Sequence, residues 1–278
     1  MKKHVLIFIF FFCTINVFAN ESFYWIELKD KKGTEFKIEE PEKFLSKKAL
    51  ERRKKYNISI NEQDLPVSKL YIQEIEKLGF RIISQSKWLN AVCVITSNKE
   101  NTKKLDALNF VNKVKYLGPK SPTFDKEKMV MDEFMDKIET YKPDSSDMDK
   151  NRFYGLSTNQ IAMTKVNYLH QLGFTGEGVT IAVLDAGFYK VNELDAFKYL
   201  WNTGRIVDVW DFVENDSNVF DADMHGMNVL SCMSTYLPMI HIGSSYGAKY
   251  LLLRTENAAN EYPIEEVWWI NGAEYADS

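Results

Sequence analysis

Hydrophobic and polar positions divide the chain into three regions with different patterns. In residues 22–118, short runs of β-branched and aromatic residues alternate with segments of helical period. Residues 119–150 carry many charges of both signs and bracketing prolines, without a strong apolar period. From residue 151 onward, longer apolar runs alternate with amphipathic segments. The pattern predicts two folded regions joined by a solvated, charged linker.

The first region predicts a small α+β domain of the ferredoxin-like kind with one antiparallel sheet. Its elements follow the order strand, helix, helix, strand, strand, helix, strand. Strands are expected at 22–29, 80–85, 88–96 and 111–118, and helices at 46–56, 67–79 and 99–110.

The last region predicts an α/β fold with a parallel, doubly wound sheet that is still unfinished at residue 278. Its apolar runs are long enough for strands that are buried on both faces. Strands are expected at 176–188, 205–213 and 247–256, and helices at 160–174, 225–237 and 263–277.

The first nineteen residues are typical of a secretion signal. Lys2 and Lys3 precede an apolar run at 5–15, and Val17-Phe18-Ala19 forms a small-residue cleavage site. The run is too short to span a membrane, so we expect the leader to be removed. The mature chain is then expected outside the cytoplasm, at the cell surface or in the periplasm, with no membrane attachment.

Composition narrows the class of protein. A hydrophobic fraction of 45% and a charged fraction of 27% exclude wholesale disorder and a multi-span membrane protein. The net charge of −4, with no clustered basic face, argues against a nucleic-acid partner. Outside the leader the chain has two cysteines, Cys93 and Cys232, in separate predicted domains. We expect two buried thiols and no disulfide.

Several kinds of site lack a basis in the sequence. Gly176 and Gly178 precede their strand, whereas a dinucleotide site needs its glycines after the strand, where a helix N-terminus receives the pyrophosphate. Walker, Cys-x-x-Cys and His-Glu-x-x-His motifs are absent from the sequence. Nicotinamide or flavin chemistry, nucleotide hydrolysis and zinc chemistry are therefore not expected.

Two residues stand out as candidates for chemistry. Asp185 ends an apolar strand, where ligands and catalytic groups gather in open α/β sheets. His225 begins an apolar helix, with Gly226 beside it. Taken singly, Asp185 is also explained as a turn or helix cap, and His225 as a capping or core residue.

Together the two residues resemble motifs of one family. V-L-D-A-G-F (183–188) resembles the aspartate motif of the subtilisin-like serine proteases, or subtilases, and H-G-M-N-V-L-S (225–231) resembles their histidine motif. Met227 and Asn228 replace the usual threonine and second histidine, which places the chain in a divergent branch. Segments 154–161 and 169–185 resemble the start of the catalytic domain in secreted bacterial members, and segment 247–256 resembles the strand that follows their histidine helix.

The resemblance implies a secreted zymogen. Residues 87–95 resemble the central strand of subtilase propeptides, and the helix at 44–55 occurs in the same secreted group. The implied organisation is a signal peptide (1–19), an inhibitor-like propeptide (20–118), the linker (119–150) and the N-terminal part of a catalytic domain (151–278). The implied partners are polypeptide substrates and the chain's own propeptide.

The resemblance also implies a role for each candidate. Asp185 is expected to orient His225, which acts as general base and acid toward a serine. The serines after His225 do not lie in the expected Gly-Thr-Ser turn, and Asn271 falls in a predicted helix instead of an oxyanion hole. We therefore expect the chain to be inactive alone, with the nucleophile and the oxyanion asparagine beyond it. Subtilases often bind calcium, but Glu193 and Asp195 match a ligand motif poorly.

Two other interpretations remain open. The subtilase-like region could serve as a non-catalytic, secreted binding module. Alternatively, the propeptide itself could be the functional part, as a folding chaperone or protease inhibitor.

Overall fold

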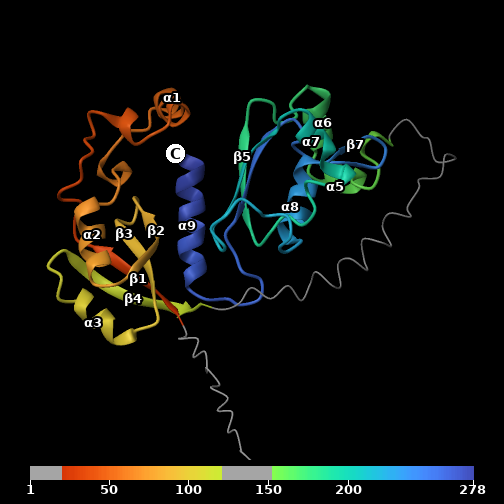
Figure 1. Ribbon diagram of the computed structural model, residues 1–278. Helices are drawn as coiled ribbons and strands as arrows, with labels where there is room; N and C mark the ends of the chain where they lie inside the picture. The colour runs from red at the N-terminus through yellow and green to blue at the C-terminus, as the bar shows by residue number, and fades with distance from the viewer. Residues whose placement is uncertain (1–20, 121–151) are drawn as a thin grey trace, which may run out of the picture.

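The computed structural model describes residues 21–120 and 152–278, which form two parts with a sheet each (Figure 1). We call residues 21–120 the N-terminal part and residues 152–278 the C-terminal part. The predicted leader (1–19) and the predicted linker, apart from its first two residues, lie outside the described residues. Within the described residues, no helix is both long and apolar enough to cross a membrane.

The N-terminal part contains a four-stranded antiparallel sheet with the strand order β2-β3-β1-β4. The predicted order of strands and helices is confirmed, although the third helix is only four residues long and follows a 3-10 turn. The elements are β1 (Ser22–Leu28), α1 (Lys47–Tyr56), α2 (Lys69–Lys77), β2 (Arg81–Ser86), β3 (Ala91–Thr96), α3 (Thr102–Leu105) and β4 (Val111–Pro119).

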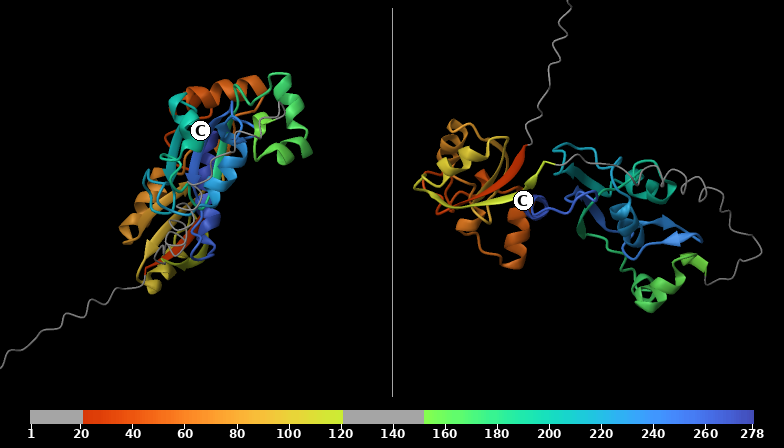
Figure 2. Two further views of the ribbon diagram at one scale, coloured as in Figure 1. Left: turned by 90° about the vertical axis from the view of Figure 1, so that its right-hand side faces the viewer. Right: turned by 90° about the horizontal axis from the view of Figure 1, so that it is seen from below.

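The C-terminal part contains a three-stranded parallel sheet with the order β5-β9-β6. The strands are β5 (Thr180–Asp185), β6 (Ile206–Asp211) and β9 (Lys249–Arg254). The remaining elements are α5 (Thr158–Met163), α6 (Val166–Gln171), α7 (Lys198–Asn202), α8 (His225–Ser234), the hairpin strands β7 (Tyr236–Leu237) and β8 (His241–Ile242), and α9 (Ile264–Asp277). Figure 2 shows α5 and α6, in green, far from the N-terminal sheet.

Helices pack on both faces of the parallel sheet. Leu230 of α8 packs with Val183 and Leu252 on one face. Gly272 of α9 approaches Leu184 on the other face so closely that a Cβ at Gly272 would lie 3.0 Å from the leucine Cδ2. Alternate residues of a strand point to opposite faces, which explains how Val183 and Leu184 serve different cores. The predicted parallel sheet with helices on both faces is confirmed for the described residues.

Helix α9 belongs to the cores of both parts. Its residues Val267 and Trp268 pack with Phe23 and Trp25 of β1, on the face of the N-terminal sheet opposite α2. Figure 1 shows α9, in dark blue, standing between the two sheets. Apolar burial of this kind contributes about 25 cal/mol for each Å² removed from water, so α9 joins the two parts through a hydrophobic core.

Three sequence predictions need correction. The expected helix at 160–174 is two short helices, because Lys165 adopts a left-handed backbone conformation (φ 60°) between α5 and α6. Helix α8 ends at Ser234, and Tyr236 begins the hairpin. Strand β5 is not buried on both faces along its length, since Thr180 is exposed.

The two cysteines differ in environment. Cys93 is buried in β3, and burial raises the pKa of its thiol far above the ordinary value. Cys232 is exposed on α8, so the expectation of two buried thiols is wrong for this residue. Both are free thiols, as expected. The apolar helical pattern did not show that position 232 falls on the solvent side of α8.

Candidate functional site

The two candidate residues lie in contact at the carboxyl end of the parallel sheet. His225 Nδ1 lies 2.8 Å from Asp185 Oδ1 and 3.0 Å from Oδ2. Because an ionised carboxylate only accepts hydrogen bonds, Nδ1 carries the proton and donates it. The neutral ring then presents Nε2 as its basic nitrogen. The structure therefore brings together both residues that the sequence singled out.

Asp185 is held by the strand ends around it. Its side chain is 8% exposed, and its Oδ1 also accepts a hydrogen bond of 2.7 Å from the Ala186 backbone N–H. Its backbone carbonyl accepts from Thr255 N at 2.9 Å, which ties β5 to the residue after β9. A buried carboxylate needs such donors, because desolvation without hydrogen bonds is costly. The carboxylate is therefore fixed before any ligand arrives.

His225 is placed by the start of α8. Its backbone N–H donates to Asp223 Oδ1 at 2.6 Å, which satisfies one of the free amides of the helix N-terminus. Its side chain is 69% exposed, so the ring faces solvent on the side away from Asp185. A solvent-facing imidazole that is anchored at one nitrogen can exchange a proton at the other.

Two glycines allow the close approach of strand and helix. A Cβ at Gly226 would lie 2.4 Å from the Gly187 carbonyl oxygen and 2.8 Å from Asp185 Cβ. Gly187 has φ of 158° and leaves equally little room, since a Cβ there would lie 2.5 Å from Asp223 N. Side chains at these positions would push α8 away from β5, and His225 with it.

Acidic groups surround the histidine. The hydrogen bond that His225 donates to Asp185 is the main cause that raises the pKa of His225, and the charges of Asp185, Asp223 and Glu256 act in the same direction. Burial raises the pKa of Glu256, and the neighbouring Asp185 raises it further. These carboxylates stabilise a protonated imidazole, which is the state that a general base reaches after it has taken a proton.

Within the described residues, no hydrogen bond joins His225 Nε2 to a serine hydroxyl. Ser231 donates to the Asn228 carbonyl of its own helix, and Ser278 donates to the Glu274 carbonyl at the end of α9. Asn271 lies in α9 and donates to the Gln85 carbonyl of β2, so it contacts the N-terminal sheet.

Glu193 and Asp195 do not belong to a carboxylate cluster among the described residues. Glu193 and Asp195 are exposed, and Asp195 pairs with Lys198. Among residues 21–120 and 152–278, no group of three or more His, Cys, Asp or Glu side chains could hold a metal ion.

Sequence reasoning missed Arg254 and Asp211. They end β9 and β6, in register with Asp185 at the end of β5. Each is a charged residue directly after an apolar run, which was the signal that identified Asp185. The sequence could have shown this signal, but the order of the strands that makes the three residues neighbours could not be known from it.

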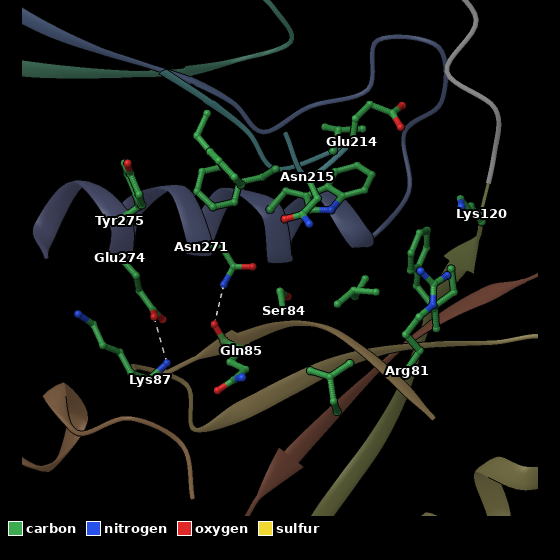
Figure 3. Close-up of a pocket in the computed structure, with 18 of the residues that line it drawn as sticks. Arg81, Ser84, Gln85, Lys87, Lys120, Glu214, Asn215, Asn271, Glu274 and Tyr275 are labelled. Carbon is green, nitrogen blue, oxygen red and sulfur yellow. Dashed lines mark hydrogen bonds between the residues drawn. The ribbon is translucent and has the colours of Figure 1, made fainter. Parts of the chain in front are cut away.

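A second set of contacts joins α9 to the turn between β2 and β3. Glu274 is 7% exposed and accepts hydrogen bonds from Ser86 Oγ (2.5 Å), Lys87 N (3.0 Å) and Trp88 N (3.2 Å). One carboxylate of the C-terminal part thus satisfies three donors of the N-terminal part. Figure 3 shows Glu274 pointing from α9 toward Lys87.

An ion-pair network adds to this junction at the end of α9. Asp277 pairs with Arg53 of α1 at 2.7 Å, and Arg53 also pairs with Asp64 at 2.6 Å. Arg53 and Asp64 are both buried. Breaking a buried pair of this kind leaves an uncompensated charge. The junction therefore has specific polar contacts as well as an apolar core.

A cavity of about 600 Å³ lies along this junction, between β2, α9 and the segment that follows β6 (Figure 3). Trp210, Phe212 and Trp268 give it aromatic walls, and Arg81 and Lys120 line it as well. Neither Asp185 nor His225 lines this cavity, so it is separate from the candidate site.

Comparison with protein families finds a match in the first half of the chain. Residues 23–132 match the family model described as "Peptidase S8 propeptide domain, Bacteroidota". No curated protein matches the chain.

Two solved structures are similar to the chain at low sequence identity. One is the epidermin leader peptide processing serine protease of Staphylococcus aureus, with 13% identity, a TM-score of 0.46, and coverage of 85% of this chain and 43% of that one. The other is fervidolysin of Fervidobacterium pennivorans, a keratinolytic enzyme related to subtilisin, with 10% identity, a TM-score of 0.45, and coverage of 85% and 30%. The chain spans less than half of the length of either structure. Residues 23–132 of the chain are therefore similar to the propeptide domain of the peptidase S8 family of subtilisin-like serine proteases.

Proposed function

We propose that the chain is the N-terminal portion of a secreted serine endopeptidase precursor, which hydrolyses peptide bonds with an Asp-His-Ser triad. The observation that carries the proposal is the contact of 2.8 Å between His225 Nδ1 and Asp185 Oδ1 at the carboxyl end of the parallel sheet. In this site Asp185 holds the ring in one tautomer and stabilises the imidazolium. His225 takes the proton from the serine hydroxyl and returns it to the leaving amine.

The serine and the oxyanion asparagine are supplied by residues outside this sequence. Two observations support this part of the proposal. None of the described serines forms a hydrogen bond with His225, and the side chain of Asn271 donates its hydrogen bond to the Gln85 carbonyl. Donors that stabilise the oxyanion contribute about 3–4 kcal/mol to such a reaction. The chain alone lacks both the nucleophile and this contribution.

Incubation of the purified 278-residue chain with an unstructured protein substrate should therefore release no peptides above background. The measurement is gel electrophoresis and mass spectrometry of the substrate after prolonged incubation. His225→Ala is the matched control, because it removes the proposed base and leaves every serine in place. Cleavage by the wild-type chain that disappears in His225→Ala would contradict the proposed inactivity.

The same proposal assigns the other segments. Residues 1–19 are a signal peptide that directs secretion, residues 20–118 a ferredoxin-like propeptide, residues 119–150 a linker and residues 151–278 part of the catalytic domain. Polypeptide substrates and the chain's own propeptide are the partners. The match to a bacterial subtilase propeptide supports the extracytoplasmic location.

A second function, for the N-terminal part, is as an intramolecular chaperone or inhibitor of the protease region. The contacts of Glu274 and Asp277 favour it, because two carboxylates of the C-terminal part bind groups on the N-terminal part. The other alternative is a non-catalytic binding module. Sequencing the gene past the codon of Ser278 distinguishes these interpretations. An open reading frame that continues and encodes a serine in a Gly-Thr-Ser turn supports the protease, and a stop codon supports the alternatives.

A further inference from the structure

Three charged residues stand side by side where the strands of the parallel sheet end. Arg254 of β9 is in register with Asp185 of β5 on one side and with Asp211 of β6 on the other. The side chain of Arg254 is 9% exposed and that of Asp211 is 1% exposed. A cation therefore lies buried one strand away from the proposed catalytic carboxylate.

The contacts of Arg254 span the sheet. Its Nη1 donates to Asp211 Oδ2 at 2.8 Å, and its Nε donates to the Ala186 carbonyl at 3.0 Å. The other oxygen of Asp211 accepts from Val213 N at 2.7 Å and Glu214 N at 3.0 Å. The guanidinium is thus fixed to β6 at one side and holds the turn after β5 at the other.

Ala186 transmits this contact to the candidate site. Its carbonyl is held by Arg254, and its N–H donates to Asp185 Oδ1 at 2.7 Å, on the same oxygen that His225 Nδ1 contacts at 2.8 Å. The planar guanidinium has donors in a fixed fork, so one side chain can define the distance between two acceptors. Fixing Ala186 in this way limits the orientations that are open to the Asp185 carboxylate.

Stability alone is a poor explanation for the pair. Burial raises the pKa of Asp211, and the Arg254 charge opposes this shift without cancelling it. Replacing buried ion pairs by apolar residues of similar volume is often neutral or stabilising. An ion pair that spans three strand ends and contacts the residue after Asp185 has a more direct use in positioning.

We infer that Arg254 is a positioning residue. Its ion pair with Asp211 fixes the guanidinium, which in turn holds the backbone at Ala186 so that Asp185 stays aligned with His225. The inference rests on the proposed function, because it gives Arg254 a role through the Asp185–His225 pair. Arg254 itself touches neither the imidazole nor the proposed site of proton transfer.

The test is an NMR titration of the histidine ring in the full chain. The chain has four histidines, and the signal of His225 is assigned by its absence in His225→Gln. The variants are Arg254→Met and Arg254→Lys. Arg254→Lys keeps the positive charge opposite Asp211 but lacks the planar set of guanidinium donors. It therefore remains informative if the methionine variant does not fold. Arg205→Met is the matched control, because Arg205 also bonds a carboxylate, Glu177, and a backbone carbonyl, that of Gly247, beside the other end of the sheet.

We expect the titration midpoint of His225 to fall by about 0.5 pH unit in Arg254→Met and to fall in Arg254→Lys, with no change in Arg205→Met. The sign is diagnostic. If the only effect of the substitution were to remove the positive charge of Arg254, the midpoint of His225 would rise, because a nearby cation disfavours the imidazolium. A fall therefore reports loss of the alignment with Asp185, while Asp223 and Glu256 stay in place around the ring.

An unchanged or raised midpoint in both Arg254 variants would overturn the inference. A general loss of stability would lower the melting temperature in the Arg254 variants and in Arg205→Met. It would not change the titration midpoint of His225 in the Arg254 variants alone. Asp185→Asn separates this failure from a failure of the proposed function. If Asp185→Asn lowers the midpoint and the Arg254 variants do not, only the positioning role is wrong. If Asp185→Asn also has no effect, the proposed function falls with it.

Discussion

Replacement of Glu274 by alanine should lower the free energy of unfolding by about 3 kcal/mol and loosen the contact between the two parts of the chain. The carboxylate is buried and accepts from Ser86 Oγ, Lys87 N and Trp88 N. Its removal leaves two backbone N–H groups and one hydroxyl without this acceptor, and hydrogen bonds to charged groups contribute more than neutral ones. The unfolding free energy is measured by urea denaturation.

Hydrogen exchange gives the local readout for this substitution. The amides of Lys87 and Trp88 should exchange faster in Glu274→Ala, because their acceptor is gone. Glu266→Ala is the matched control on the same helix, since Glu266 is exposed and pairs with Lys115 at 3.4 Å. An exposed pair contributes about 1 kcal/mol or less. If Glu274→Ala behaves like Glu266→Ala in both measurements, Glu274 does not hold the junction. Glu274→Gln keeps the volume and remains testable if the alanine variant does not fold.

Gly226→Val should lower the free energy of unfolding by about 3 kcal/mol and separate His225 from Asp185. A Cβ at this position would lie 2.4 Å from the Gly187 carbonyl oxygen and 2.8 Å from Asp185 Cβ, and both groups belong to the strand end that α8 must approach. Backbone atoms cannot rotate away as a flexible side chain can, so α8 has to move. The measurements are urea denaturation and the NMR titration of His225.

The matched control for Gly226→Val is Asn228→Val, at an exposed position of the same helix. It introduces the same β-branched residue, whose helix propensity costs below about 1 kcal/mol, without the close contact. Gly226→Ala adds only the Cβ and serves if the valine variant does not fold. Equal losses of stability in the variants at positions 226 and 228 would mean that the close approach at Gly226 is unimportant.

Much of the fold could be predicted because its signals are local. The apolar run before Asp185 and the helical spacing around Ile75 each identify an element from neighbouring residues alone. Lys165 shows the limit of such signals. A single left-handed residue divides one predicted helix into α5 and α6, although the apolar period continues across it. Tertiary contacts determine where such a left-handed residue interrupts a helix, and these contacts cannot be inferred from the hydrophobic period.

The candidate site was predicted in part for the same reason. Asp185 and His225 occur in recognisable local motifs, so they could be paired although they lie forty positions apart in the sequence. Arg254 and Glu274 act through partners that lie far away in the sequence, Ala186 and the turn at Ser86. Their importance depends on which strands are neighbours and on which face α9 packs. Neither property can be read from the residues beside them.

The pH dependence of His225 follows from its contact with Asp185. The aspartate raises the pKa of the folded ring above its ordinary value of 6.5. The contribution of the pair to stability is therefore fully present below the pKa of the unfolded state and is lost as the pH rises through the raised pKa of the folded state. Because the ring is mostly exposed, solvent screens part of this effect.

The most direct measurement is the NMR titration of His225 in the wild-type chain and in Asp185→Asn, which keeps the shape of the side chain and removes its charge. We expect His225 to titrate above its ordinary pKa in the wild-type chain and at lower pH in Asp185→Asn, while His170 and His241 are unchanged. Equal midpoints for His225 in the two proteins would contradict the proposed Asp-His pair, and with it the assignment of the C-terminal part to a serine protease.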